Sequence, residues 1–367
     1  MISSNYSIFG RGYAKPFEFV VKTDNAGTSA TNQFTIPTTG SGYNYTIKTS
    51  DGQTISGITG SYTITFPSIG TYTIKISGVF PKIYFNNGGD KLKILSVNNW
   101  GIYGLGVFSY TNNFYVCTNL TAIGSDVANF NLITTGDNCF GFCKIATLPT
   151  DMTLNLLVTG LGMFRGNLFL SLPSSMNLPN LTNGSTMFYD GKLTSLPSSM
   201  TLPLLTNGTS MFFSNDITTL PSSMNLPLLT NGSSMFSGNG LTSLPSGMNL
   251  PLLTNGTSMF FTNSLTSLPS GMNLPNLTNG SNMFWTNSLT DLPIGMTLPK
   301  LTNGSNMFRD CTINTIRYSQ LLIDMAANNP NNNVTFHGGL SKYNTAGQTA
   351  RNTLTSRGWI ITDGGLE

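Results

Sequence analysis

The sequence predicts a β-rich, multidomain protein: a small N-terminal β-sandwich, then a long solenoid of 24-residue repeats, and last a small αβ cap. Three observations lead to this fold class. Residues 17–80 alternate apolar and polar side chains, the dipeptide Met-Phe recurs with a fixed period, and apolar residues after position 316 switch to helical spacing. At 367 residues the chain is also longer than one ordinary globular core.

The first element is the β-sandwich of residues 17–80. Its apolar residues alternate with polar ones, as at Phe17, Phe19 and Val21, and turn signals such as Asp51-Gly52 separate the alternating segments. Alternation of this kind is typical of antiparallel strands with one buried face. Residues 1–16 form a polar N-terminal arm, which we expect a partner in an assembly to hold.

Residues Tyr45 to Gly78 contain an Asp-Gly turn that is followed by Pro67, Gly70 and Tyr72. This pattern resembles the Ig-like modules of the polycystic-kidney-disease (PKD) type, with one extra residue between the Pro and the Gly. The resemblance implies an Ig/PKD-like β-sandwich. Whether a metal ion sits in this module is left open by the residues.

The second element is the repeat region, residues 81–316, which begins with a segment (81–106) that covers the first repeat. One repeat reads LTSLPSGMNLPLLTNGTSMFFTNS. A unit of this size cannot bury its apolar face alone and does so by stacking on its copies. Counting two degenerate repeats, we expect about nine units. The marker Phe of each repeat is Phe114, Phe140, Phe164, Phe188, Phe212, Phe236, Phe260, Phe284 or Phe308.

The third residue after each marker Phe is Asn or Cys, except at Gly191. An apolar residue follows closely, as in the Asn/Cys-x-Leu signature of leucine-rich repeats, where stacked side chains satisfy backbone groups of neighbouring turns. We therefore interpret these residues as a structural ladder, and its cysteines as structural thiols and not as metal ligands or disulfides. The ladder consists of Cys117, Cys143, Asn167, Asn215, Asn239, Asn263, Asn287 and Cys311.

The phrases Gly208-Thr-Ser-Met-Phe212 and Leu193-Thr-Ser-Leu-Pro197 resemble the BspA-like leucine-rich repeat family, in particular its surface- and lipoprotein-associated branch. The resemblance covers about residues 80–365. It implies a leucine-rich-repeat-like solenoid with one short strand per turn near Leu-Thr-Ser-Leu. Parallel strands would add about 4.8 Å per repeat and give a rod on the order of 40 Å. The upstream LxxLxL spacing is not met, so the array is a relative of the classical repeat.

The residue directly after each marker Phe varies most between repeats and is often large. Stacked at intervals of one repeat, these side chains would form a ladder along one edge of the rod. Aromatic and Arg side chains on a rigid surface are common anchors for protein or sugar partners. The alternative is a second packing stripe beneath a loop, and the sequence leaves both open. The candidate ligand-binding residues are Arg165, Tyr189, Phe213, Phe261, Trp285 and Arg309.

The last element is the C-terminal αβ cap, residues 317–367. Tyr318, Leu321 and Met325 have helical spacing, and a short apolar strand follows at residues 334–336. Residues 345–357 favour a second helix, and residues 359–361 a last strand.

Charge and hydropathy exclude several classes of protein. Only 8% of the residues are charged and the net charge is +3 without a run of basic residues, so we expect no nucleic-acid binding. No apolar segment reaches the roughly 18 residues of a membrane-spanning helix, and the N-terminus lacks the apolar core of an export signal. We therefore expect no membrane insertion, and synthesis in a cytoplasm.

Residues suited to catalysis are scarce. The single histidine, His337, has no recognisable partners for a catalytic triad or a zinc site. Gly-rich phosphate loops are missing, and the acids in the repeats stand at irregular places. Asn-Gly-Ser/Thr sequences, such as that at Asn183, are interpreted as turns and not as glycosylation sites. We expect no enzyme, no cofactor and no metal site in the repeats.

Two functions in different settings remain. The first is a structural protein of a bacteriophage virion: a fibre, tail or head decoration protein. Its arm and sandwich would contact other virion proteins, and its solenoid would display a surface to a host glycan or protein for attachment. The second is a bacterial cell-surface BspA-like adhesin that lacks its export signal. Association into a homo-oligomer is compatible with either.

Overall fold

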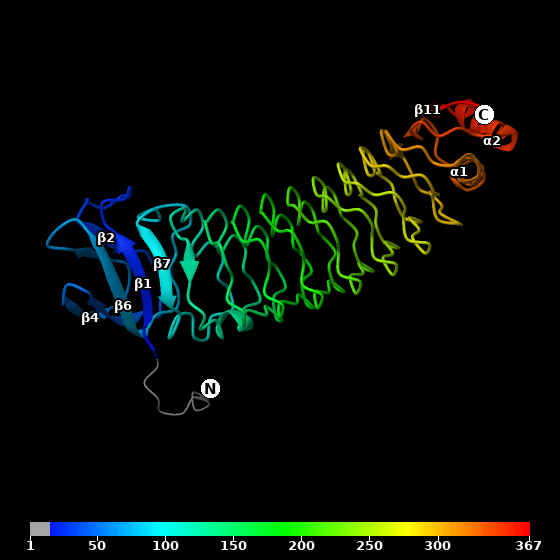
Figure 1. Cartoon of the computed structure of the whole chain (residues 1–367). Helices are drawn as coiled ribbons and strands as arrows, with labels where there is room; N and C mark the ends of the chain where they lie inside the picture. Colours follow the sequence, from blue (N-terminus) through cyan, green and yellow to red (C-terminus); the bar gives the residue numbers. More distant parts are fainter. Residues whose placement is uncertain (1–14) are drawn as a thin grey trace.

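A computed structural model describes residues 15–367 of the chain. These residues form an elongated molecule in which β-sheets lie at the N-terminal end, a curved array of repeats follows, and two helices close the C-terminal end (Figure 1). The expected N-terminal arm, residues 1–16, lies almost wholly outside the described residues.

Eight strands belong to the N-terminal sheets: β1 (Phe17–Lys22), β2 (Gln33–Ile36), β3 (Asn44–Thr49), β4 (Thr54–Ile58), β5 (Tyr62–Thr65), β6 (Thr71–Val79), β7 (Ile94–Asn99) and β8 (Ala122–Ile123). One sheet has the order β4-β3-β6-β1-β7-β8, and β2 pairs with β5 in a second sheet. In β1 the alternating side chains Phe17, Phe19 and Val21 are fully buried. The apolar side chains of the alternating pattern in β1 therefore face the core.

The larger sheet extends past residue 80, where the sequence suggested that the sandwich ends. Strand β7 comes from the segment 81–106 and pairs antiparallel with β1, and β8 pairs parallel with β7. The ring of Trp100 lies 5.9 Å from that of Phe17 and 5.7 Å from that of Phe114. One apolar core therefore runs from the sheets into the repeats.

A buried ion pair fixes the loop between β1 and β2. Asp90 and Lys93 are almost fully buried, 3.9 Å apart. Asp90 accepts the N–H groups of Ser29 at 3.0 Å and Thr35 at 2.7 Å, and Lys93 Nζ donates to the carbonyl of Gln33 at 2.9 Å. Burial alone would raise the pKa of Asp90, but these hydrogen bonds and the Lys93 charge outweigh it, and the pKa is lowered. Asp90 is therefore charged in the folded protein, whereas burial lowers the pKa of Lys93 and the charge of Asp90 opposes that shift.

The fold class predicted from the sequence is wrong. It expected β-rich domains and a leucine-rich-repeat-like solenoid in which one strand per repeat joins a long parallel sheet. Strands make up only 17% and helices 8% of the structure, and the strands fall into several small, separate sheets. Between residues 124 and 302 the structure contains no strand, only the short helix η1 (Phe130–Leu132). The segment Leu193-Thr-Ser-Leu-Pro197, where the strand was expected, is irregular.

Left-handed backbone conformations explain why no sheet forms in the repeats. In each repeat the residues two before and two after the marker Phe have positive φ, as do Thr186 (φ 53°) and Asp190 (φ 53°) around Phe188. A left-handed residue turns the chain out of the extended conformation. The chain therefore bends twice where a strand would need to run straight.

Neighbouring repeats are joined by single parallel bridges, from Ser109–Thr135 to Asn279–Asn303, and, beside the marker Phe, by four hydrogen-bond columns; backbone bonds elsewhere in the repeat run the other way. In each column an N–H of one repeat donates to a carbonyl of the next repeat, so every donor points toward the C-terminal end. In one repeat the donors are Gly184, Thr186, Phe188 and Asp190, and the acceptors are Asn207, Thr209, Met211 and Phe213, at 2.8–3.0 Å.

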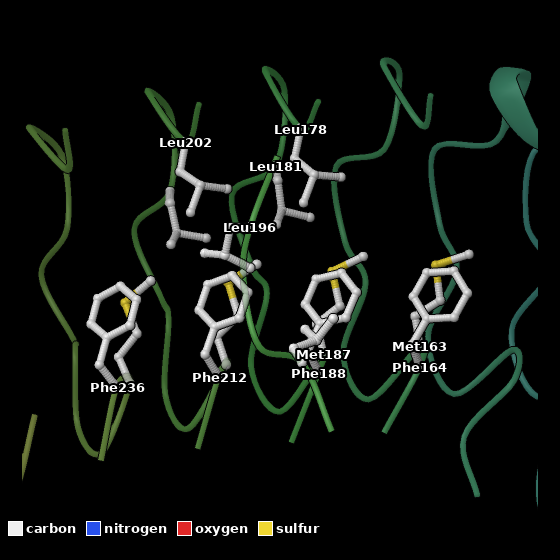
Figure 2. Close-up of a cluster of buried hydrophobic side chains, with 14 of the residues drawn as sticks. Met163, Phe164, Leu178, Leu181, Met187, Phe188, Leu196, Leu202, Phe212 and Phe236 are labelled. Carbon is white, nitrogen blue, oxygen red and sulfur yellow. The ribbon is translucent and has the colours of Figure 1, made fainter. Parts of the chain in front are cut away.

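The Met-Phe pairs form the core of these repeats, together with leucines such as Leu178 and Leu181 (Figure 2). From Phe114 to Phe308, successive marker rings stack with centroids 5.5–5.9 Å apart and planes within 5–11°. Each Met lies against a Gly of the preceding repeat: a Cβ on Gly208 would come within 2.7 Å of the sulfur of Met235. The Gly is therefore required by close packing.

The C-terminal cap consists of α1 (Thr315–Asn328), β10 (Thr335–His337), α2 (Thr345–Ser356) and β11 (Ile360–Thr362). This order is compatible with the expected αβ cap. Strand β9 (Asn303–Gly304), in the last repeat, pairs parallel with β10, which pairs parallel with β11. The N–H of Phe308 donates to the carbonyl of His337 at 3.1 Å. The cap therefore continues one of the hydrogen-bond columns.

The ring of His337 lies where the cap meets the last repeat. Its Nδ1 accepts the N–H of Gly339 at 3.0 Å, which requires that nitrogen to be unprotonated. Partial burial and then the charge of Arg309 lower the pKa of His337 below its usual 6.5, and Asp310 and Asp363 oppose the shift. The folded cap therefore favours the neutral ring.

Replacing Lys93 by Met should lower the free energy of unfolding by about 3–5 kcal/mol, because the charge of Asp90 stays buried without its partner. Urea denaturation measures this loss, and the double variant Asp90→Asn/Lys93→Met should recover part of it. Lys75→Met, which removes an ion pair with Glu18 in which Lys75 is 53% exposed, is the control and should cost less than about 1 kcal/mol. Equal losses in the two single variants would contradict the interpretation.

The cap should lose stability as the pH falls below about 6.5. The unfolded chain protonates His337 near its usual pKa, whereas the folded chain does so only at lower pH, so stability rises with pH through this window. Thermal unfolding between about pH 7.5 and about pH 5 tests this. In His337→Asn, whose Oδ1 can accept the N–H of Gly339, the dependence should be weaker; an identical pH profile would rule out His337 as its source.

Candidate functional site

The Asn side chains of the predicted structural ladder lie buried or half-buried between repeats. Asn263 shows the arrangement: its Nδ2 donates to the carbonyls of Phe236 at 2.9 Å and Phe260 at 3.1 Å, and its Oδ1 accepts the N–H of Leu241 at 3.0 Å. One side chain thus joins backbone groups of two repeats. The same three contacts recur at Asn167, Asn215, Asn239 and Asn287.

Cysteines take the place of Asn at Cys117, Cys143 and Cys311, which are buried and form no disulfides. The Sγ of Cys143 donates to the carbonyl of Phe114 at 3.3 Å. Burial raises the pKa of Cys311 to about 11, and it also raises the pKa values of Cys117 and Cys143. These thiols are therefore protonated at neutral pH and poor nucleophiles.

The residues directly after the marker Phe form what we call the outer ladder, a row of half-buried or exposed side chains along one edge of the array. The guanidinium of Arg165 lies between the rings of Phe142 and Tyr189, 4.8 Å and 4.4 Å from their centroids. The ring of Tyr189 stacks on that of Phe213 at 5.0 Å and 9°. These side chains therefore cover one another's faces.

A second group of the outer ladder lies closer to the cap. The rings of Phe261 and Trp285 are 5.0 Å apart, and the guanidinium of Arg309 lies 4.7 Å from the Trp285 ring. The indole N–H of Trp285 donates to Asp310 at 2.9 Å. Ser237, which holds the same position between the two groups, is only 1% exposed. The small Ser divides the ladder in two.

The six candidate binding residues thus lie in two groups of three. The sequence did not reveal Phe142, which stacks on Arg165 and lies 6.1 Å from the ring of Tyr115. Phe142 stands two residues after its marker Phe140 and is therefore out of register with the others. Tyr115 is in register, and the same spacing could have identified it.

The stacked arrangement limits what the outer ladder can bind. The central ring of each group, Tyr189 or Trp285, has a neighbour on both sides, so a partner would meet its edge, the Tyr189 hydroxyl and guanidinium N–H groups. The Nε of Arg165 is buried and, among the described residues, has no hydrogen-bond partner. Partial exposure of the row distinguishes it from the core, where the marker Phe side chains are at most 1% exposed. The geometry suits contact with a polar partner that lies along the edge.

A second row of exposed side chains was missed. Leu204, Leu228 and Leu252 are 38–41% exposed, each sixteen residues after a marker Phe, and Asn180 and Asn276 hold the same position on either side. The row is short and bounded by polar groups. In the sequence this row could have been recognised as an apolar residue that recurs at a position outside the core.

Metal-ligating groups do not gather in the part of the chain that the structure describes. In residues 15–367 no three His, Cys, Asp or Glu side chains are placed to hold a metal ion. A groove of about 790 Å³ near Leu148 and Leu170 is lined by apolar, Ser and Thr residues and contains no ionisable side chain. Across the same range, no helix has the length and apolar character needed to span a membrane.

Comparison with known proteins adds no relative: no family model matches the chain, and no curated protein is similar to it. The likeness to BspA-like repeats and PKD-type modules therefore stays a prediction.

Replacing Asn263 by Ala should lower the free energy of unfolding by about 2–4 kcal/mol, because two carbonyls and one N–H lose their buried partner. Asn263→Cys should cost less, since Cys311 shows that a thiol fits this position and bonds the carbonyl of Phe284 at 3.6 Å. Urea denaturation of the two variants gives the comparison. If Ala and Cys cost the same, the side chain contributes by filling space and not by hydrogen bonding.

Proposed function

We propose that the protein is a non-enzymatic structural and adhesion protein of a bacteriophage particle, a fibre, tail or head decoration protein, whose repeat array displays the outer ladder to a host surface. The observation that carries this proposal is the outer ladder. The six candidate side chains occupy the position that varies most among otherwise similar repeats; five are half-buried and Arg309 is exposed. Packing does not require a large residue there, because Ser237 fills the same position.

The physical state of the ladder favours binding. Side chains that are already stacked lose little conformational freedom when a partner binds, which lowers the cost of association. Tyr, Trp and Arg are also the residues that most often dominate the binding energy of interfaces. The exposed donors and ring edges fit a host glycan or a polar protein surface.

The arrangement of the molecule supports the same function. The N-terminal sheets lie at the opposite end of the array from the cap (Figure 1). Attachment of the sheets to other particle proteins would leave the long edge of the array free, whether the protein acts as a single chain or as a homo-oligomer. The same edge would serve an adhesin on a bacterial cell surface. Antibody labelling of purified phage and of bacterial cells distinguishes the two locations.

Replacing Tyr189 and Phe213 together by Ser should abolish most binding to host cells while the protein stays folded. We expect a loss of affinity of at least about tenfold, since removal of central aromatic anchors costs more than about 1.4 kcal/mol. Fluorescently labelled protein and flow cytometry measure the binding, and thermal unfolding measures the fold. Ser is chosen because Ser237 already occupies this position.

Leu228→Ser, in the exposed leucine row, is the matched control and should leave binding unchanged. Full binding by the double Ser variant would show that the outer ladder is not the contact surface. Equal loss in both variants would assign the effect to the array as a whole and would also contradict the proposal.

A further inference from the structure

Six repeats carry the dipeptide Asn-Gly at the same position, just before the Met-Phe pair. In an Asn-Gly sequence the side-chain amide carbon lies within reach of the next backbone nitrogen, and Gly has no side chain to hinder the attack. The dipeptide is therefore chemically reactive wherever its backbone is free to move. The six residues are Asn183, Asn207, Asn231, Asn255, Asn279 and Asn303.

The fold holds both reacting groups in place. The N–H of Gly232 donates to the carbonyl of Asn255 at 2.9 Å, and the Oδ1 of Asn231 accepts the N–H of Ser233 at 3.2 Å. The first five dipeptides share the Gly bond at 2.8–3.0 Å, and all six share the side-chain bond at 3.1–3.2 Å. The sixth dipeptide, Asn303-Gly304, is strand β9 and pairs with β10 of the cap.

We propose that these six asparagines are sites of spontaneous deamidation. The folded array prevents the reaction, and local opening of a repeat allows it. In the open repeat the Gly nitrogen bonds to the Asn amide carbon and forms a five-membered succinimide. The former amide nitrogen leaves as ammonia and takes up the proton of the Gly N–H. Water then adds to one of the two ring carbonyls and breaks its bond to the ring nitrogen, which gives either aspartate or isoaspartate. No oxidant or cofactor is consumed.

Either product prevents the repeat from closing as before. Isoaspartate carries the backbone through the side-chain carbon, and this displaces the Gly N–H from its column. Aspartate places a negative charge at a position where the neighbouring repeats have neutral Asn, and a second event next to it brings two like charges together. Deamidation in the open state thus makes the opening of a repeat irreversible.

Position in the array sets the order in which the sites react. Each repeat contacts only its neighbours, so local opening depends on the local contacts on either side. The Asn ladder lies within the same repeats: the contacts of Asn263 connect the repeat that holds Asn255 to the repeat before it. Loss of the Asn263 contacts should therefore increase the rate of deamidation at Asn255.

The experiment incubates the full chain at mildly alkaline pH in native buffer and in urea, and peptide mass spectrometry follows each site. Besides the Asn-Gly dipeptides at Asn87 and Asn239, which are followed separately, all six sites should convert to acid in urea. In native buffer the same sites should react at least about a hundredfold more slowly, as set by the free energy of opening. Asn225-Leu226, Asn249-Leu250 and Asn273-Leu274 lie in the same repeats and serve as controls, which should keep their amides in both buffers.

A second arm compares Asn263→Ala with Lys75→Met, both in native buffer. Conversion at Asn255 should rise in the first variant and stay at the wild-type rate in the second. Equal rates for the wild type in native buffer and in urea would overturn the proposal, as would intact Asn-Gly sites in urea. If Asn263→Ala fails to fold, the wild-type comparison still decides, because it needs no variant.

Discussion

The hydrogen-bond columns beside the marker Phe residues are the constraint on which the rest of the structure depends. The carbonyl of Asn183 accepts the N–H of Gly160, and the N–H of Gly184, in the same peptide group, donates to Asn207. Peptide groups are therefore linked in series with one polarity, as along an α-helix, and polarise one another. In a parallel strand the intervening peptide groups would pair with the neighbouring repeats as well, but here the N–H of Met187 donates within its own repeat, to the carbonyl of Gly184 at 3.0 Å. The columns therefore join the repeats without forming a sheet.

Stacking also explains the low charge of the chain. Equivalent side chains of neighbouring repeats lie close together, as the Phe rings do at 5.5–5.9 Å. Two like charges at such a distance repel by about 3 kcal/mol at an effective dielectric constant of 20. No two neighbouring repeats carry like charges at the same position, and Lys192 and Asp216, which are equivalent, have opposite charges. Repetition of neutral Thr, Asn and Ser is therefore a condition of stacking.

The sequence predicted those positions at which the same residue type has the same structural role in every repeat. Period, marker Phe and the buried Asn positions such as Asn263 follow from regular spacing. The backbone could not be predicted in this way, because Thr186 and Ser210 adopt left-handed conformations that their side chains do not favour. Tertiary contacts impose them. For a similar reason the sequence did not predict that the sheet continues through β7, because β7 pairs with β1, which is far away in the chain. For the outer ladder the spacing identified the row, but not Phe142, which stands one position later, at the left-handed residue two after its marker Phe.

The division of the outer ladder favours one kind of partner over another. Arg165, Tyr189 and Phe213 form one stacked group, Phe261, Trp285 and Arg309 form the other, and Ser237 separates them. A small ligand could contact only one group, whose central ring, Tyr189 or Trp285, has a neighbour on both sides. An extended chain, whether a glycan or a peptide, could contact both, and the second contact then benefits from the high effective concentration that the first creates. The division of the outer ladder into two groups thus favours extended partners over small ones.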